Sequence, residues 1–197
     1  MPIILTIANV KGGVGKTTSA ICLATALAGT RTVKVWDADP QATATEWAES
    51  AQDLGEPLPF SVEVINRARL DRKARQSTAD YVLIDTPPGD PAMIDAAMHI
   101  ADLVIMPTSP SVVDFQRMLQ TASSVPAGIP KVALITQANK RTVVYREAME
   151  FLATQDDIAV FSMAVGNRQA IQNSYGSRPD IFHEYSFITD EILEVTS

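Results

Sequence analysis

The sequence has little of what several classes of protein require. A single cysteine, Cys22, excludes a disulfide framework and a Cys-x-x-Cys metal pattern, and we expect it to be a small buried apolar side chain. No apolar run approaches the roughly 18 residues of a membrane-spanning helix, and Met1–Ile3 leads directly into a predicted strand instead of a signal peptide. Neither His99 nor His183 has a partner at catalytic or metal-ligand spacing, so both are interpreted as structural. These absences favour a cytoplasmic protein.

Positive charge is also scarce. Lys and Arg number 16 against 23 Asp and Glu, which gives a formal net charge of −7. A dedicated DNA-binding domain usually carries a basic excess, so any nucleic-acid binding must come from a local patch. The content of 46% hydrophobic and 20% charged residues is typical of a globular chain. Because the 197 residues show no internal repeat, low-complexity segment or linker, one domain over residues 1–197 is predicted.

A glycine-rich segment, residues 9–18, lies between a predicted strand and a predicted helix. The strand is the apolar, β-branched run Ile3–Ala8, and the helix covers residues 19–28, which are rich in Ala, Leu and Ile without Gly or Pro. Strand, glycine-rich turn, Lys-Thr and helix together are the context of a phosphate-binding P-loop. Glycines let consecutive backbone N–H groups converge on phosphate oxygens, and the helix adds its positive N-terminal dipole. The segment therefore predicts nucleotide binding, whereas its alternative is a glycine-rich turn with a chance Lys-Thr.

Two side chains of this loop have predicted roles. Lys16 is expected to supply a positive charge to the terminal phosphates, and the Thr17 hydroxyl is placed to ligate Mg²⁺. The residues predicted to cradle the nucleotide are Lys11, Gly12, Gly13, Val14, Gly15, Lys16, Thr17 and Thr18.

The adjacent glycines and a second lysine give the loop a more specific pattern. Lys11 to Thr17 reads Lys-Gly-Gly-Val-Gly-Lys-Thr, which resembles the fingerprint of the deviant Walker A ATPases. That family includes the ParA/Soj partition proteins, MinD and the nitrogenase iron protein. In it the first lysine reaches across a dimer interface to the partner's nucleotide, so the resemblance implies an ATP-dependent homodimer with catalytic roles for Lys11 and Lys16. The single cysteine argues against the cluster-bridged iron protein.

Acidic residues end two further predicted strands. Asp37 and Asp39 follow the strand 31–37, and Asp85 ends the strand 81–85. Ligands of α/β sheets bind at this carboxyl edge of the strands. The Asp-x-Asp-Pro-Gln run resembles the family's second motif, which implies that Asp39 positions the hydrolytic water and Asp37 supports the metal's hydration shell. An Asp-Pro turn with solvated acids is the alternative. Asp85 resembles a Walker B acid that holds Mg²⁺ through water, so ATP and Mg²⁺ are the predicted cofactors.

The remaining chain alternates strands and helices. This alternation predicts a doubly wound α/β domain, with a mostly parallel central sheet flanked by helices. Ser111 is expected to cap a helix, with Asp114 at the capping-box position. The other strands are expected at 61–65, 102–107, 131–136 and 158–161, and the other helices at 42–53, 91–101, 111–124, 142–154, from 166, and 182–194.

Three places are considered for nucleic-acid contact. Residues 67–75 carry five basic residues against one acid, a pattern more typical of a solvated helix face than of a DNA patch. The stretch 166–171 resembles the place where partition ATPases have a DNA-contacting arginine, which points to Arg168, although a surface salt bridge is an equal alternative. Lys140 and Arg141 are the further candidate contacts, in a stretch where the family commonly contacts adenine.

The resemblance implies a short ParA-type partition ATPase without an N-terminal helix-turn-helix. Such a protein hydrolyses ATP slowly, binds nonspecific DNA as an ATP-dependent dimer, and is released when a centromere-binding ParB-type partner stimulates hydrolysis during plasmid or chromosome partition. It would be nucleoid-associated. The alternative is a MinD-like or scaffold-positioning ATPase on a membrane or protein assembly. The polar side of 182–194 is acidic, which speaks against a membrane. A ligase or synthetase of the same fold needs a second pocket, for which no residues are evident.

Overall fold

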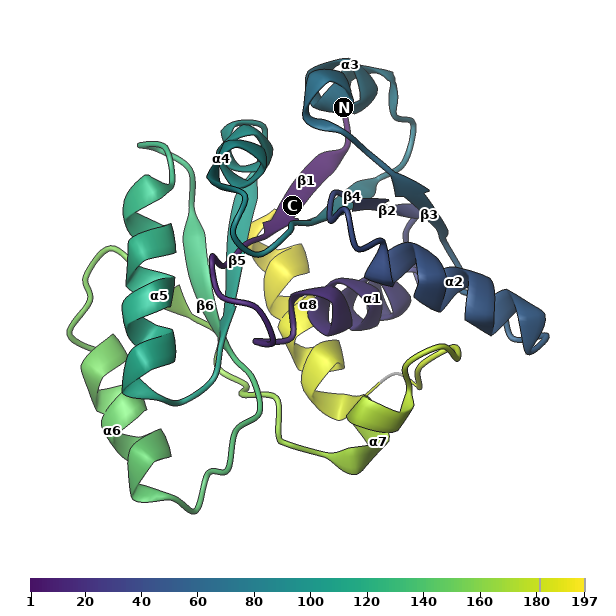
Figure 1. The fold of residues 1–197 in the computed structure, drawn as a ribbon. Helices are drawn as coiled ribbons and strands as arrows, with labels where there is room; N and C mark the ends of the chain where they lie inside the picture. The colour runs from purple at the N-terminus through teal and green to yellow at the C-terminus, as the bar shows by residue number, and fades with distance from the viewer. Residues whose placement is uncertain (181, 197) are drawn as a thin grey trace.

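A computed structural model describes residues 1–180 and 182–196, which form a seven-stranded sheet between two layers of helices (Figure 1). The strand order is β3-β2-β4-β1-β5-β6-β7, and every pairing is parallel. The predicted doubly wound fold is confirmed, with a sheet more uniformly parallel than expected. The strands are β1 (Ile3–Ile7), β2 (Val33–Asp37), β3 (Ser61–Val64), β4 (Tyr81–Asp85), β5 (Leu103–Thr108), β6 (Lys131–Ile135) and β7 (Ala159–Val160).

The helices divide between the two faces of the sheet. Apolar side chains of α1, α2, α7 and α8 pack on one face, and those of α3, α4, α5 and α6 on the other. The helices are α1 (Lys16–Leu27), α2 (Thr43–Asp53), α3 (Leu70–Gln76), α4 (Pro91–His99), α5 (Val112–Ser124), α6 (Val143–Leu152), α7 (Gln169–Asn173) and α8 (His183–Val195), with a 3₁₀ turn η1 (Arg67–Arg69) before α3. No helix within the described residues is long and apolar enough to cross a membrane.

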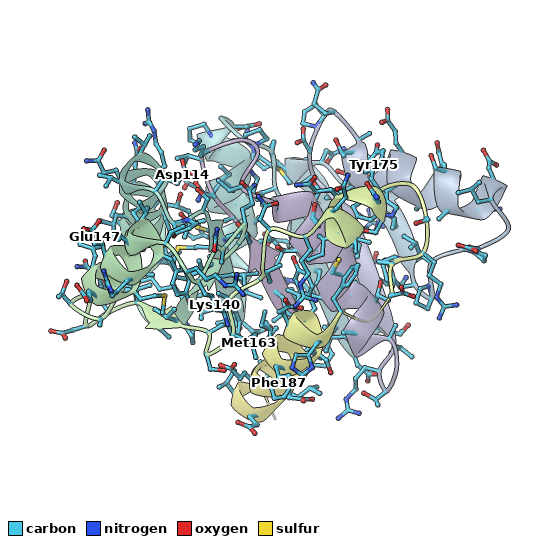
Figure 2. All side chains as sticks on the ribbon, turned by 90° about the horizontal axis from the view of Figure 1, so that it is seen from below. Asp114, Lys140, Glu147, Met163, Tyr175 and Phe187 are labelled. Atoms are coloured by element: carbon cyan, nitrogen blue, oxygen red, sulfur yellow. The ribbon has the colours of Figure 1, made fainter. Side chains whose placement is uncertain are left out.

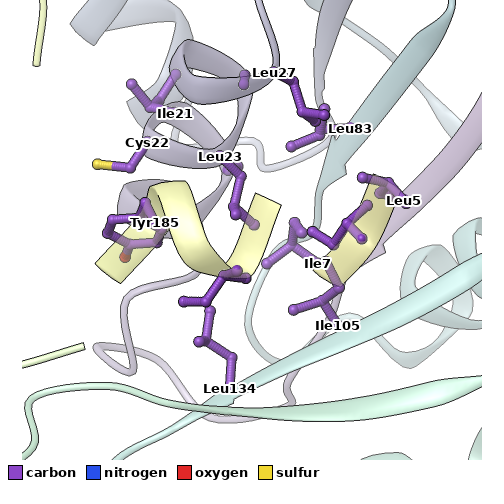
Figure 3. Close-up of a cluster of buried hydrophobic side chains, with 14 of the residues drawn as sticks. Leu5, Ile7, Ile21, Cys22, Leu23, Leu27, Leu83, Ile105, Leu134 and Tyr185 are labelled. Carbon is purple, nitrogen blue, oxygen red and sulfur yellow. The ribbon is translucent and has the colours of Figure 1, made fainter. Parts of the chain in front are cut away.

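The core on the α1 face lies between the central strands and the helices α1 and α8 (Figure 3). β1 contributes Leu5 and Ile7, and α8 contributes Tyr185, all essentially without exposed surface. Cys22 on α1 is buried among them, as predicted, and burial raises the pKa of its thiol to about 12. α1 therefore packs between the sheet and α8. This packing fixes the position of α1 after the P-loop.

Two local predictions need correction. Ser111 does cap α5, since its Oγ accepts a hydrogen bond from the Asp114 amide at 3.2 Å, but the Asp114 carboxylate contacts Lys11 and the Ser109 hydroxyl and does not close a capping box. The helix expected from residue 166 begins only at Gln169. Gly166 is held before it in a parallel bridge to Ala138, which prolongs the sheet pairing beyond β6.

Candidate functional site

The P-loop joins the central strand β1 to α1 and depends on two left-handed glycines. Gly13 has φ +77° and Gly15 has φ +86°, values that a residue with a Cβ adopts only with strain. Gly15 is the N-cap of α1, and its carbonyl accepts the hydrogen bond from the Ser19 amide at 2.8 Å. Within the described part of the chain no side chain caps this helix end, so its first N–H groups point at the place expected for phosphates.

Asn9 fixes the start of the loop. Its Oδ1 accepts a hydrogen bond from the Lys11 amide at 2.9 Å, and its Nδ2 donates to the Pro107 carbonyl at 2.8 Å. The side chain is fully buried. Asn9 thereby ties the P-loop to the end of the neighbouring strand β5, a role that sequence reasoning did not assign.

Two residues after β6 hold the loop from the other side. Thr136 Oγ1 donates to the Val14 carbonyl at 2.9 Å, and Gln137 Nε2 donates to the Gly13 carbonyl at 2.8 Å. Gln137 itself has φ +52°, an uncommon value for a residue other than glycine. These bonds occupy loop carbonyls, so the loop can present its N–H groups without rearranging. Neither contact has a local signal in the sequence, because the paired residues are 122 and 124 positions apart.

Lys16 lies inside the site. Its side chain is almost fully buried, and its Nζ donates to the Lys11 carbonyl at 2.9 Å. Burial lowers the pKa of this ammonium, and the carboxylates of Asp85 and Asp39 act against that shift. The structure thus brings Lys16 together with two of the predicted acidic residues, at the edge where a phosphate would be held.

Asp85 is the most unusual acid of the site. Its two carboxylate oxygens are buried and have no hydrogen-bond partner of normal geometry among the described residues. Burial raises the pKa of Asp85 to about 7, while the nearby Thr17 hydroxyl and the Lys16 ammonium lower it. Buried, unpaired carboxylate oxygens beside Thr17 fit a hydrated Mg²⁺. No cluster of three His, Cys, Asp or Glu in the described residues encloses a metal alone, as expected for Mg²⁺ bound largely by phosphates and water.

Asp37 lies opposite Asp85 across the β2–β4 pair but has a different environment. Its carboxylate accepts hydrogen bonds from the Thr45 amide at 2.9 Å, the Thr45 hydroxyl at 2.8 Å and the Asp39 amide at 3.2 Å. These hydrogen bonds show that Asp37 stabilises the turn between β2 and α2. Its support of a metal hydration shell stays a prediction. Ala42, at φ +54°, ends the same turn in a strained conformation.

Asp39 lies on this turn, half-buried. Its Oδ1 accepts a hydrogen bond from the Gln41 amide at 2.9 Å. It also lines an open cavity of about 480 Å³ together with Asn66, Arg67 and Asp90. The carboxylate is thus held by its own turn while facing open space, which leaves room for a water molecule beside it.

A second cavity, of about 230 Å³, lies on the other side of the P-loop. Thr18 and Gln137 line it, and so do Trp47 and Tyr175, whose rings are 5.2 Å apart (Tyr175 is labelled in Figure 2). An aromatic wall beside the phosphate loop suits a nucleoside. Sequence reasoning placed adenine contacts in the stretch after β6, which includes Gln137, but did not find the two aromatic residues.

Residues 5–178 match the family model described as the CobQ/CobB/MinD/ParA nucleotide binding domain. The chain belongs to this family. Membership confirms the family resemblance drawn from Lys11 to Thr17.

Proteins that are similar to this chain carry different names. A maintenance of carboxysome distribution protein A from Gloeobacter kilaueensis is 35% identical over 146 residues, which cover 72% of this chain and 66% of that relative. A plasmid partition protein from Borrelia burgdorferi has a TM-score of 0.78 at 24% identity, over 98% of this chain and 99% of that one. Cobyrinic acid a,c-diamide synthase from Mycobacterium smegmatis, with bound ATP analog and magnesium, has a TM-score of 0.74 at 20% identity, over 100% and 96%. The two structures show a shared fold.

Lys11, the lysine that precedes the two adjacent glycines, points away from its own P-loop. Lys11 Nζ contacts the carboxylate of Asp114 on α5 of the same chain, and the Ser109 hydroxyl donates to that carboxylate as well. Burial alone would raise the pKa of Asp114, but the Lys11 ammonium and the Ser109 hydroxyl hold it below its usual range. Lys11 is half-exposed, so this contact can be exchanged for another anion.

The three predicted DNA contacts are not equivalent in this domain. Arg168 Nη2 forms a 2.7 Å ion pair with Oε1 of Glu184, a buried carboxylate of α8, and lines the aromatic cavity beside the P-loop. Lys140 lies with its Nζ 3.8 Å from the Met163 sulfur (Figure 2), and Arg141 is exposed. A DNA contact by Arg168 would leave Glu184 without its cation, which makes the salt-bridge interpretation the better supported one.

Replacing Asp85 with asparagine tests the buried charge. The pKa of about 7 lies above the ordinary value of about 4, so between these pH values the folded state keeps a proton that the unfolded state has lost, and the free energy of unfolding falls as pH rises. Without nucleotide and Mg²⁺ at pH 8, we expect Asp85→Asn to be more stable than the wild type by about 2 kcal/mol, or roughly 4–8 °C in Tm. The difference should vanish at pH 4.

Thermal unfolding from pH 4 to 8 measures this effect, with and without Mg²⁺ and ATP. The stabilisation by Mg²⁺ and ATP should be lost in the same variant, because the carboxylate that receives the hydrated metal is gone. A variant that is less stable at pH 8 and still responds to Mg²⁺ would contradict the assignment of Asp85.

Proposed function

We propose that the protein is a Mg²⁺-dependent ATPase of the ParA type that positions a cargo on a DNA surface. The observation that carries this proposal is the buried, unpaired carboxylate of Asp85, which lies beside Thr17 and Lys16. These two residues belong to the Lys-Gly-Gly-x-Gly-Lys-Thr loop. The Mycobacterium synthase of the same fold has a bound ATP analog and magnesium, which supports these two cofactors.

Each residue of the site has one task in this proposal. The N–H groups at the start of α1 and the Lys16 ammonium bind the phosphates, and Thr17 and Asp85 receive Mg²⁺. When held there, Mg²⁺ would supply positive charge that offsets the negative charge on the phosphates during hydrolysis. Asp39 is held by the turn that follows β2, and it orients the attacking water from the side of the open cavity. Residues 86–89, Thr-Pro-Pro-Gly, follow Asp85 and form the loop that would sense the γ-phosphate, and hydrolysis is slow until a partner orders this loop.

The homodimer is part of the proposal because of Lys11. In the single chain the Lys11 ammonium is neutralised by Asp114. In a dimer built as the family resemblance implies, this lysine exchanges Asp114 for the phosphates on the partner. ATP is then required for dimerisation. Without its phosphates, the Lys11 ammonium would lose Asp114 at the dimer interface and gain no other anion in exchange. Two DNA surfaces joined in one dimer bind with an avidity that a monomer lacks.

The nature of the cargo has two candidates. The Borrelia plasmid partition protein supports plasmid or chromosome partition, with a ParB-type centromere-binding partner. The Gloeobacter relative is named for carboxysome distribution and supports the positioning of a protein assembly, with a scaffold protein as partner. The proposed ATPase cycle on DNA is the same for both candidates, which differ in the partner that would stimulate hydrolysis.

Binding of nonspecific duplex DNA tests the proposal directly. We expect binding with ATP and Mg²⁺, and little or none with ADP or without nucleotide, with an affinity that falls steeply over a salt series. Fluorescence anisotropy of a labelled duplex measures it, and sedimentation reports the dimer in parallel. ATP-dependent dimers without DNA binding would contradict the DNA surface, and turnover that requires a small carboxylic acid would instead indicate a synthetase.

A further inference from the structure

We propose that η1 and α3 carry the surface that binds the phosphate backbone of duplex DNA. This inference rests on the proposed function and assigns its DNA contact to a different place from the one predicted by resemblance. The surface consists of Arg67, Arg69, Arg72 and Arg75, named here the α3 arginine strip. All four side chains belong to exposed residues.

The strip concentrates positive charge in an acidic chain. Residues 67–75 contain five of the 16 Lys and Arg residues but only one of the 23 Asp and Glu residues, Asp71. A local excess of this kind is what a protein of net charge −7 needs to approach a polyanion. The charge balance of the whole chain therefore does not argue against DNA binding at this place.

Packing of α3 turns the arginines outward. Leu70 and Ala74 are buried against the apolar cluster that includes Trp36 and Ile84, and they define the inner side of the helix. With about 100° per residue, Arg72 points directly away from that side. Arg75 lies about 60° from Arg72 by the same geometry, whereas Asp71 lies at the flank. Arg69 precedes the helix as the last residue of η1 and is exposed as well.

Ion pairing leaves these arginines available. Glu63 on β3 neutralises the neighbouring lysines, with Lys73 Nζ at 2.5 Å and Lys34 Nζ at 3.4 Å from its carboxylate oxygens. By contrast, none of the four arginines has a carboxylate oxygen within 4 Å among the residues that the structure describes. A planar guanidinium without a protein partner is suited to bidentate contact with phosphate.

The position of the strip also suits an ATP-controlled contact. Arg67 lines the open cavity that contains Asp39 and Asp90, so the strip begins beside the proposed hydrolytic site and continues along α3. The seven residues of α3 extend over about 10 Å, a length along which duplex DNA presents several phosphates. α3 lies at the top of Figure 1 and α6 at the lower left, so the strip is well separated from Lys140 and Arg141, which precede α6.

The test replaces three members of the strip that do not line the catalytic cavity. In R69Q/R72Q/R75Q we expect DNA affinity with ATP and Mg²⁺ to fall on the order of 100-fold at about 0.1 M salt. The slope of log affinity against log salt should become shallower by about 0.9 for each phosphate that the variant no longer neutralises. ATP-dependent dimerisation and the basal ATPase rate should stay unchanged, which shows that the variant is folded and binds nucleotide.

A matched control removes the same charge elsewhere. K140Q/R141Q/R146Q also loses three positive charges and includes Lys140 and Arg141, the two further candidate DNA contacts. We expect its DNA affinity to stay within about threefold of the wild type, since only the long-range field changes. An equal loss of DNA affinity in the two variants, or a loss only in the control, would contradict the assignment of DNA binding to the α3 arginine strip.

The remaining outcomes separate the inference from the proposed function. If R69Q/R72Q/R75Q binds DNA like the wild type, the strip is not the DNA surface while the DNA-dependent function stands. If the wild type forms ATP-dependent dimers and does not bind DNA in any nucleotide state, both fail. Vesicles of anionic phospholipid are measured beside the DNA, and binding to vesicles alone would overturn the assignment to DNA.

Discussion

Replacing Lys16 with alanine is expected to abolish ATP binding, with the dissociation constant raised on the order of 100-fold or more. Lys16 is the one buried ammonium that the structure places between the P-loop carbonyl of Lys11 and the carboxylates of Asp85 and Asp39. No other described lysine lies at this position, so the charge that Lys16 is proposed to supply to the terminal phosphates cannot be replaced locally. Isothermal titration with ATP and Mg²⁺ measures the loss.

Stability decides whether this loss reflects the site. Lys16→Ala removes a buried cation whose pKa is already lowered by burial, so we expect the nucleotide-free protein to unfold within a few degrees of the wild type. Lys34→Ala, a change of the same size on β2, serves as the control and should bind ATP normally. ATP binding by a folded Lys16→Ala protein within about threefold of the wild type would contradict the P-loop assignment.

Local sequence patterns were sufficient for the elements that carry the site. The sequence predicted strands at residues 3–8 and 81–85, and the structure has β1 and β4 there, buried within a parallel sheet. Each strand ends at its functional residues, the P-loop and Asp85. Because parallel strands share a carboxyl edge, placing the motifs at strand ends was enough to bring them together.

Long-range side-chain partners could not be obtained in this way. The Lys11–Asp114 and Arg168–Glu184 pairs depend on how α5 and α8 pack, and no spacing in the sequence specifies either. A short pattern marked Asp114 as a capping residue, but the nearby ammonium is the stronger electrostatic partner for a mostly buried carboxylate. Glu184 is a similar case, because it was counted only as part of the acidic side of helix 182–194, and no local pattern indicated its burial or its ion pair with Arg168.

Backbone strain was equally invisible. Ala42 and Gln137 both adopt positive φ, although neither residue type favours that region. Ala42 closes the turn that holds Asp39, and Gln137 contacts the P-loop carbonyl of Gly13. The strain at Gln137 is accompanied by its long-range hydrogen bond to Gly13, and the strain at Ala42 by the hydrogen bond of its amide to the Asp39 carbonyl within the turn. Both places adjoin the proposed nucleotide site, where such conformations concentrate.

Arg168 and the α3 arginine strip differ in whether a carboxylate of the protein neutralises their charge. Arg168 has a buried carboxylate as its partner, so its charge is already used within the fold. The α3 arginine strip has no such partner among the described residues, although the composition of residues 67–75 first suggested a solvated helix face. A solvated face and a phosphate-binding face look alike in sequence. What distinguishes them is the burial of Leu70 and Ala74 together with the absence of acids paired to the strip in the described part of the chain, and both are properties of the fold.

Replacing Asp39 with alanine is expected to separate ATP binding from ATP hydrolysis. Among the described residues, no hydrogen bond joins the Asp39 carboxylate to the P-loop, although its charge acts on Lys16, and its Oδ1 accepts a hydrogen bond from the Gln41 amide within its own turn. ATP affinity should therefore stay within about threefold, whereas the turnover number should fall on the order of 100-fold or more, because a positioned acid or base contributes at least that much. The ATP-bound dimer should then persist, which sedimentation after ATP addition measures beside phosphate release.

Asp39→Asn is the matched variant, because an amide oxygen can still accept the hydrogen bond from the Gln41 amide. If the carboxylate acts on water, both variants lose turnover to a similar extent, and both keep ATP-dependent DNA binding for hours instead of releasing it. A turnover loss only in Asp39→Ala would assign the residue to the structure of the turn. Normal turnover in both variants would show that the hydrolytic water is oriented by another group, and among the acids at this edge Asp90, which lines the same cavity, would be the next to replace.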